Sequence, residues 1–150
     1  MKTFIGSDHA GYNLKEKIKK YLIKSGIDFQ DLGAKGLNPK DDYPDFAIAA
    51  AKKVAGNPGS LGIIICGTGL GSCIAANKIR GIRAAPAWNP DTAAQAREHL
   101  DANVLCLGAR VLTLVEVKEI LARWLETKFS GEERHLRRIK KITGLEKWPR

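Results

Sequence analysis

The sequence predicts an α/β protein: a three-layer α/β/α sandwich of Rossmann-like type, built on a five-stranded parallel sheet with a C-terminal helical extension. Short apolar segments alternate five times with longer segments whose apolar residues recur at helical spacing, the pattern of parallel strands joined by crossover helices. Residues 61–65 form a continuous apolar run, as expected of a strand that is covered on both faces.

The first two strand–helix units occupy the N-terminal third of the chain. Residues 2–6 are strand-like, and residues 11–25 carry apolar side chains at helical spacing before a glycine ends the helix. A second strand is expected at residues 27–32. A loop rich in Gly, Asn and Pro covers residues 33–42, and an alanine-rich helix with proline at its start follows at residues 44–55.

Three further units follow the same pattern. The apolar strand at residues 61–65 ends in a glycine-rich loop, which leads into a helix that extends through residue 78. The remaining strands are expected at residues 82–87 and 102–107, and their helices at residues 91–99 and 113–127. A basic helix at residues 131–145 is the C-terminal extension, with Leu136, Ile139 and Ile142 on its apolar side.

Composition and charge limit the class of protein. With 150 residues, 44% hydrophobic residues and a net charge of +9, the chain fits one globular domain over residues 1–150. It has no apolar run near the about 20 residues that span a bilayer, and it starts on a strand-like segment rather than a signal peptide. Cys66, Cys73 and Cys106 form neither a CxxC pair nor a zinc motif, so we expect no metal and a cytoplasmic location.

The glycine-rich loop is the first candidate site. Gly67, Gly69 and Gly71 lie between a buried strand and a helix, where backbone N–H groups favour a phosphate or an oxyanion. The loop is not a dinucleotide fingerprint, because the third glycine of that motif would fall at Ser72. A plain tight turn is the alternative.

Cys66 directly precedes this loop. A thiol at the end of a strand and beside helix-terminal N–H groups is placed to ionise, which makes Cys66 a candidate base or nucleophile. The alternative is a small buried apolar residue, the interpretation that we favour for Cys73 and Cys106. Asp8 and His9 end the first strand and would face the same crevice if strands one and three are neighbours. A helix N-cap by Asp8, with His9 exposed, is the other possibility.

Two polar groups lie later in the chain. His99 and Asp101 form a polar helix-to-strand turn, which in isolation needs no functional explanation. Arg134 and Arg138 are four residues apart and share a helical face, so two guanidinium groups can converge on one dianion. A solvated charged face is the ordinary alternative. The basic tail, with seven basic and three acidic residues from 132 to 150, fits nucleic acid, an acidic membrane surface or a phosphorylated small molecule.

Taken together, these motifs resemble the ribose-5-phosphate isomerase B family, which also includes galactose-6-phosphate isomerase subunits. The resemblance covers nearly the whole chain. Eight ordered segments carry it: residues 6–11, 42–44, 66–71, 75–78, 81–84, 97–99, 101–105 and the Arg134-His135 pair with Arg138.

The resemblance implies that the protein interconverts ribose 5-phosphate and ribulose 5-phosphate through an enediolate, without a metal or another cofactor. It implies that Cys66 is the base, that Thr68 relays a proton between the oxygens and that His99 opens the sugar ring. Asp8 and Asn103 would hold hydroxyls, and Tyr43 would line the pocket. The other expected substrate-binding residues are the loop residues Gly67, Gly69, Gly71 and Ser72 and, at the phosphate end, His9, Arg110, Arg134 and Arg138.

By the same resemblance the site is shared between two subunits of a homodimer or a dimer of dimers. The apolar side of the C-terminal helix would dock on the partner, which supplies His99 and the tail arginines. No nucleic acid or membrane partner is expected. Leu100 stands where the family usually has Asn, and Trp88 follows the fourth strand. We expect both to border the sugar, so tetrose 4-phosphate, allose 6-phosphate and galactose 6-phosphate are alternative substrates. A nucleotide- or nucleic-acid-binding module is the less favoured hypothesis, because no aromatic side chains that could stack on bases lie among the basic residues.

Overall fold

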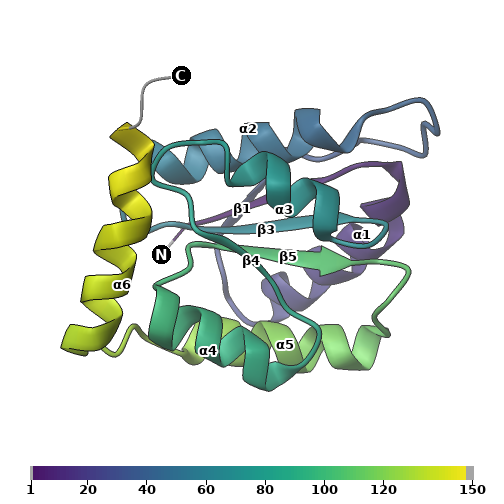
Figure 1. Cartoon of the computed structure of the whole chain (residues 1–150). Helices are drawn as coiled ribbons and strands as arrows, with labels where there is room; N and C mark the ends of the chain where they lie inside the picture. Colours follow the sequence, from purple (N-terminus) through teal and green to yellow (C-terminus); the bar gives the residue numbers. More distant parts are fainter. Residues whose placement is uncertain (1, 148–150) are drawn as a thin grey trace.

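The strands of the computed structural model, which describes residues 2–147, form one parallel sheet in the order β2-β1-β3-β5-β4 (Figure 1). They are β1 (Thr3–Ser7), β2 (Phe29–Asp31), β3 (Leu61–Cys66), β4 (Ala84–Pro86) and β5 (Val104–Gly108). The predicted parallel sheet is confirmed, and its order places β3 at the centre between β1 and β5. Met1 and residues 148–150, which include the last arginine of the basic tail, lie outside the described residues.

Helices cover both faces of this sheet. They are α1 (His9–Lys24), α2 (Tyr43–Ala55), α3 (Leu70–Ala76), α4 (Pro90–Leu100), α5 (Leu114–Glu126) and α6 (Glu133–Gly144), followed by the short 3₁₀ turn η1 (Leu145–Lys147). Adjacent residues of β1 show the two faces: Ile5 packs in the cluster under α1, α4 and α5, and Phe4 in the cluster under α2 and α3. The three-layer sandwich is therefore confirmed (Figure 1).

Several elements are shorter than the sequence predicts. β4 begins at Ala84 rather than residue 82, because the Arg83 N–H donates to the side chain of Asn103 at 2.8 Å. α3 ends at Ala76 rather than residue 78, where the Lys78 N–H donates to Ala75 O in a turn. Periodicity locates an element, but such local hydrogen bonds decide where it ends.

A buried lysine supports the first strand–helix unit. Lys15 is 1% exposed, and its Nζ donates to the Asp31 carboxylate at 2.8 and 3.0 Å and to Ala34 O at 2.7 Å. Burial opposes ionisation of Asp31, but hydrogen bonds from Lys15 and Lys19 outweigh it and leave the pKa of Asp31 below its ordinary value. This ion pair joins α1 to the edge strand β2.

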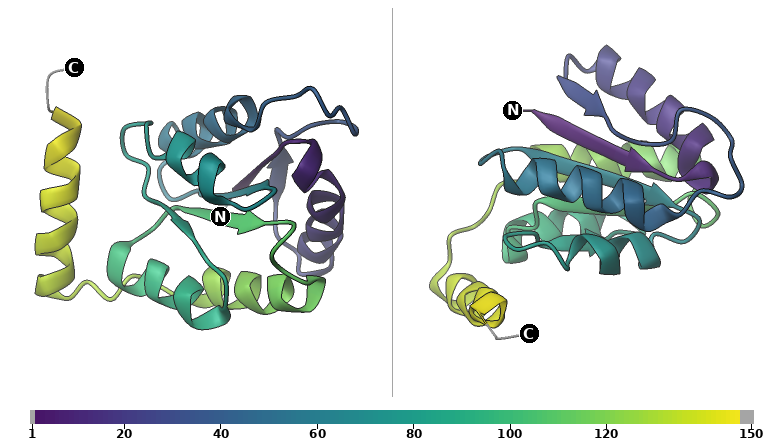
Figure 2. Two further views of the ribbon diagram at one scale, coloured as in Figure 1. Left: turned by 45° about the vertical axis from the view of Figure 1, so that its right-hand side comes forward. Right: turned by 90° about the horizontal axis from the view of Figure 1, so that it is seen from above.

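The basic C-terminal helix forms as predicted, over Glu133–Gly144. Figure 2 shows α6, in yellow, standing beside the sandwich rather than in either helical layer. Leu136 and Ile142 on its apolar side are each about half exposed. Within the described residues, the structure has no helix whose length and apolar character would let it cross a membrane.

Candidate functional site

Cys66 is the last residue of the central strand, and its sulfur has two polar neighbours. The Gly69 N–H donates to Cys66 Sγ at 3.2 Å, and the Ser72 hydroxyl also lies 3.2 Å from Sγ. Cys66 is buried and Ser72 is completely inaccessible. The buried sulfur of Cys66 thus has polar contacts from the loop and the helix that follow it.

The loop after Cys66 packs against the end of β5 with no room for side chains. A Cβ added to Gly108 would lie 2.6 Å from the carbonyl oxygen of Thr68. Gly69 has a φ of +82°, which favours glycine, and its Cα faces the backbone of Leu107. The Ala109 N–H also donates to Cys66 O at 2.9 Å. Main-chain contacts thus hold the loop in place.

Two predicted site residues pack on the same loop. Tyr43, at the start of α2, lies so close to Gly71 that a Cβ there would be 2.6 Å from its ring. The Arg110 guanidinium lies over Gly67, and the Arg110 N–H donates to Gly67 O at 2.9 Å. The structure therefore brings Tyr43 and Arg110 to the loop from two other elements.

Fewer backbone N–H groups of the loop are available to bind an anion than the sequence suggests. The Gly69 N–H already donates to Cys66 Sγ, and the Leu70 N–H lies 3.4 Å from Thr68 Oγ1. Both amides serve the loop itself. An oxyanion at this loop would therefore depend on its other N–H groups.

Asp8 and His9 lie at the same edge of the sheet, because β1 pairs with β3 in parallel. Asp8 caps α1 by accepting the Gly11 N–H at 3.0 Å, which confirms the N-cap alternative. His9 is only partly exposed, contrary to that alternative, and its Nδ1 lies 2.5 Å from an oxygen of Asp41. The same oxygen accepts the His9 backbone N–H at 3.1 Å.

Sequence reasoning missed Asp41, although it directly precedes the Asp42-Tyr43-Pro44 motif. Together with Asp8 and His9 it forms a group whose candidate ligand atoms all lie within 4.8 Å of one another, as a metal site would require. These atoms are already engaged with one another and with α1. The geometry favours an oriented imidazole: with Nδ1 bonded to Asp41, Nε2 is left for a ligand.

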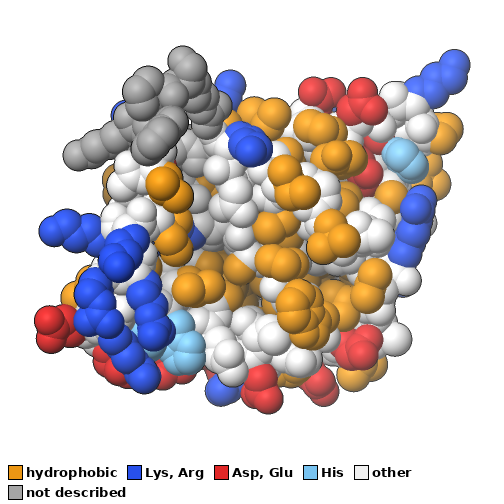
Figure 3. Space-filling model, viewed as in Figure 1, with side chains coloured by type: hydrophobic (Ala, Val, Ile, Leu, Met, Phe, Trp, Pro, Cys, Tyr) orange, Lys and Arg blue, Asp and Glu red, His pale blue; other side chains and the backbone are white. Residues whose placement is uncertain are grey.

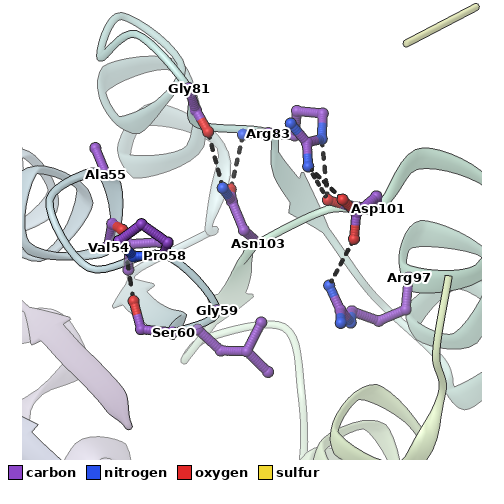
Figure 4. A pocket seen from close by; sticks show the side chains of 11 residues that line it. Val54, Ala55, Pro58, Gly59, Ser60, Gly81, Arg83, Arg97, Asp101 and Asn103 are labelled. Carbon is purple, nitrogen blue, oxygen red and sulfur yellow. Dashed lines mark hydrogen bonds and ion pairs between the residues drawn. The ribbon is translucent and has the colours of Figure 1, made fainter. Parts of the chain in front are cut away.

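Asn103 does not join this group. It directly precedes β5, at the opposite end of the sheet from Cys66, and its amide is bonded on both sides: it accepts the Arg83 N–H at 2.8 Å and donates to Gly81 O at 2.8 Å (Figure 4). These bonds connect β4 and β5. The expectation that Asn103 holds a substrate hydroxyl does not fit this position, because both halves of the amide are already used.

Figure 4 shows the cavity at this end of the sheet, with a volume of about 320 Å³. Its wall includes Arg83, whose guanidinium donates to the Asp101 carboxylate at 2.7 Å and to the carbonyl oxygens of Leu100 and Asp101. Asp101 has a φ of 44° and ends α4. The polar helix-to-strand turn predicted here is therefore confirmed as a structural feature.

His99 and the tail arginines also lie away from Cys66 in this chain. Cys66 pairs with Gly108 at the last residue of β5, whereas His99 precedes the first. The five residues of β5 span about 16 Å at 3.3 Å each. Arg134 pairs with Glu132 at 2.8 Å, and both Arg134 and Arg138 are exposed. One chain thus presents two separate groups of predicted site residues.

The other two cysteines are buried, as the favoured interpretation predicts. Cys73 and Cys106 are both buried and not in a disulfide. Contact with Cys73 and then burial raise the pKa of the Cys106 thiol well above its ordinary value, so Cys106 remains protonated at neutral pH. Cys73 also has polar contacts, since its Sγ lies 3.3 Å from Ala84 O and accepts from the Asn77 side chain at 3.6 Å; Cys66 differs in lying at the end of the central strand, beside the glycine-rich loop.

An exposed apolar surface lies beside the glycine-rich loop. Figure 3 shows hydrophobic side chains gathered over α3 and the segment that follows β4. Leu70, Ile74, Trp88 and Val111 are each more than half exposed. A cavity of about 370 Å³ between Trp88, Leu70 and Val111 also contacts Thr68. Surfaces of this kind mark sites of protein–protein contact.

Comparison with known proteins gives a consistent result. Residues 3–142 match the model of the Ribose/Galactose Isomerase family. Over 144 residues the chain is 46% identical to a probable ribose-5-phosphate isomerase B of Mycoplasma pneumoniae, covering 96% of this chain and 94% of that one. It is 45% identical over 139 residues to ribose-5-phosphate isomerase B of Mycobacterium tuberculosis, covering 93% and 86%.

Solved structures are equally similar. Ribose-5-phosphate isomerase B of Clostridium thermocellum superposes with a TM-score of 0.94 at 48% identity, covering 98% of both chains. The enzyme of the same name from Mycoplasma genitalium, solved with bound ribulose-5-phosphate, superposes with a TM-score of 0.94 at 46% identity, covering 99% of this chain and 97% of that one.

Proposed function

Because the chain belongs to the ribose/galactose isomerase family, we propose that it interconverts ribose 5-phosphate and ribulose 5-phosphate, with Cys66 as the catalytic base. The M. genitalium relative, whose structure holds ribulose-5-phosphate, supports this choice of substrate. The single observation that carries the role of Cys66 is its sulfur at the end of the central strand, beside the Gly69 N–H and the Ser72 hydroxyl.

The reaction moves one proton from carbon to carbon. The Cys66 thiolate removes the C2 proton of the aldose, and the C2–H electron pair forms the C1–C2 double bond while the carbonyl oxygen becomes an enediolate oxygen. The Thr68 hydroxyl then relays a proton between the two oxygens. Return of the proton from the Cys66 thiol to C1 gives the ketose. A positioned base of this kind contributes about 10²- to 10⁴-fold in rate.

Negative charge that develops on the substrate oxygen needs donors. We assign these to the backbone N–H groups of the Gly67–Gly71 loop that are not used within it. Each well-aimed donor contributes about 3 kcal/mol. Catalysis then requires no metal or other cofactor.

Other residues at the same edge of the sheet would hold the substrate. Asp8 uses one carboxylate oxygen to cap α1 and offers the other to a sugar hydroxyl. His9, oriented by Asp41, and Arg110 face the phosphate end, while Tyr43 lines the wall. Asn103 is left out of the proposed site, since its amide connects β4 to β5.

A second copy of the chain completes the site. His99, which opens the sugar ring, lies at the far end of β5 from Cys66, so one small substrate reaches both only if they come from different subunits. Arg134 and Arg138 would then bind the phosphate in the neighbouring site. The exposed apolar surface around Trp88 and Leu70 supports a homodimer, alone or as a dimer of dimers.

Two exposed apolar residues, Trp88 and Leu100, bear on the choice of sugar. Trp88 lies beside the cavity that contacts Thr68, and Leu100 directly follows His99. A bulky ring and the lack of an amide favour a compact substrate, which supports the pentose and keeps a tetrose phosphate as the second candidate. Three free thiols suit a reducing compartment, so we place the protein in the cytoplasm.

The test is a coupled assay with purified protein and no added metal or nucleotide. Cys66→Ala should lower kcat by about 10²- to 10⁴-fold while ribose 5-phosphate still binds. Cys73→Ala, which removes a neighbouring buried thiol, is the matched control and should keep full activity. If Cys66→Ala remains active, Cys66 is not the base.

A panel of tetrose, pentose and hexose phosphates tests the choice of sugar. The pentose phosphate should give the highest kcat/KM. Salt-sensitive binding to duplex DNA that ribose 5-phosphate does not reverse, with no isomerase activity, would instead favour the nucleic-acid module.

A further inference from the structure

His135 is the one buried residue of α6, the helix that otherwise projects into solvent. It is 2% exposed, and its ring packs on the ring of His99 with centroids 4.4 Å apart and planes tilted by 40°. His99 itself keeps 38% of its side chain exposed. One face of the His99 ring is therefore covered by His135, and the rest is open to a ligand.

Ser130 fixes the other side of His135. Its hydroxyl lies 2.8 Å from His135 Nδ1, while the Glu132 N–H donates to the same oxygen at 3.3 Å. The Ser130 hydroxyl therefore bonds both the His135 ring and the backbone at the start of α6, which fixes the orientation of the ring. The Ser130 N–H donates to Glu98 O at 3.0 Å, which ties this arrangement to α4.

The charges around the pair favour a neutral His135. Burial lowers the pKa of His135 first, and His99, Arg134 and Arg138 lower it further against the opposing effect of Glu132. A neutral imidazole can stack on His99 in either protonation state of His99 without placing two cations in contact.

The far end of α6 is also attached to the same chain. The Gly81 N–H donates to the Glu146 carboxylate at 2.9 Å, and the Arg80 guanidinium donates to Glu146 O at 2.9 Å. The backbone after His99 is held independently, by the Arg83 guanidinium on Leu100 O and Asp101 O. The helix thus joins the sandwich at both ends, and His135 is its contact with His99.

We propose that His135 is a positioning residue: its buried ring holds His99, and with it the helix that carries Arg134 and Arg138, as one preassembled half-site for the neighbouring subunit. This inference rests on the proposed shared site. His135 contacts no reacting atom; it sets the orientation of the residue that opens the ring. Its loss should lower kcat on ribose 5-phosphate by about 10- to 100-fold, by analogy with residues that orient metal-binding imidazoles.

Mixing of variant subunits tests this assignment. Cys66→Ser and His135→Ala damage different half-sites, so each mixed dimer contains one complete site. A 1:1 mixture should recover about a quarter of wild-type turnover, because half of the dimers are mixed and one of their two sites is intact. The pair Cys66→Ser with His99→Asn is the reference and should recover as much. Cys66→Ser with Asp8→Asn affects one half-site and should recover nothing.

The outcomes separate the two proposals. If the His99 pair recovers and the His135 pair does not, His135 is not a positioning residue of the donated half-site, and the shared site still stands. If neither pair recovers, the shared site fails and takes this inference with it. Full activity of His135→Ala on its own would also overturn the inference.

Proton exchange distinguishes a positioning role of His135 from a general effect on the structure. The C5 hydroxyl of ribulose 5-phosphate carries the phosphate, so this ketose remains open-chain, and exchange of its C1 proton with D₂O needs the base but not ring opening. His135→Ala should retain this exchange at saturating ketose while losing turnover of ribose 5-phosphate. Loss of both activities would contradict the assignment.

Two further variants keep the inference testable if His135→Ala does not fold. His135→Phe keeps a ring against His99 but loses the bond to Ser130, so it should lower turnover of ribose 5-phosphate several-fold, less than His135→Ala does. Ser130→Ala leaves the ring buried but frees Nδ1, and should lower turnover of ribose 5-phosphate several-fold without affecting exchange. Equal effects of Ser130→Ala on both reactions would overturn the inference.

Discussion

The loop after Cys66 and the α6 helix hold their functional residues by opposite means. Cys66 ends a buried strand, and its loop is fixed by main-chain contacts so close that Gly69 and Gly108 leave no room for a Cβ. The α6 helix is exposed and relies on one buried side chain, His135, and on contacts at its ends. The contrast teaches that the proton-transfer site depends on backbone geometry, whereas the donated residues depend on individual side chains.

The largest effect should come from crowding the loop. Gly108→Ala would place a Cβ 2.6 Å from Thr68 O and push the loop away from Cys66. A displacement of about 1 Å at a reacting group costs about 100-fold in rate, so kcat/KM should fall at least that far. Gly144→Ala at the end of α6, where a Cβ meets nothing within 4 Å, is the control and should leave activity unchanged. Steady-state kinetics give kcat/KM for both variants. Equal values would show that the loop is no more sensitive to an added Cβ than the end of α6.

The next effect concerns the ion pair between Lys15 and Asp31, which joins α1 to β2. Asp31→Ala would leave the Lys15 ammonium buried with only Ala34 O and a more distant Glu16 for partners. We expect a loss of about 2 to 3 kcal/mol in the free energy of unfolding, measured by urea denaturation. Lys15→Met combined with Asp31→Ala should recover most of it, because no buried charge then lacks a partner. Equal stability of Asp31→Ala and the wild type would show that the pair contributes nothing.

A smaller effect should separate residues within α6. Arg134→Ala should raise KM for ribose 5-phosphate about 10-fold and change kcat little, since phosphate binding acts on ground and transition states alike. Arg137→Ala removes an equally exposed arginine of the same helix and should change neither parameter. A fall in kcat alone in Arg134→Ala would contradict the phosphate role.

The smallest effect is on acid stability. Burial lowers the pKa of His135 in the folded protein, so the unfolded chain binds its proton first, near the ordinary histidine pKa of about 6.5. The stability that neutral His135 contributes is therefore present above this pH and decreases as the pH falls below it. Melting temperatures between pH 7 and pH 5 should decline less in His135→Phe than in the wild type. Parallel curves would show that His135 does not titrate differently on folding.

Local patterns predicted most of the fold, whereas the roles of the site residues stay predictions. Alternating periodicities located all five strands and the helices, and the residues at the carboxyl ends of β1 and β3 were grouped correctly because parallel neighbours end at one edge. Asn103 and Asp41 show what local sequence patterns cannot predict. Asn103 bonds across 20 residues to Arg83, and Asp41 across 32 residues to His9. Such pairings depend on strand order and loop path, which no periodicity encodes.

Because β3 is hydrogen-bonded to β1 on one side and to β5 on the other, its amides belong to the part of the molecule that exchanges with solvent only on global unfolding. We expect the α6 helix, with His135 as its one buried residue, to open at lower free energy than the sheet. Mild heating therefore releases the C-terminal helix before the sheet loosens. Heat inactivation of this protein should begin as a reversible event, with recovery on cooling, well below the temperature at which the chain aggregates.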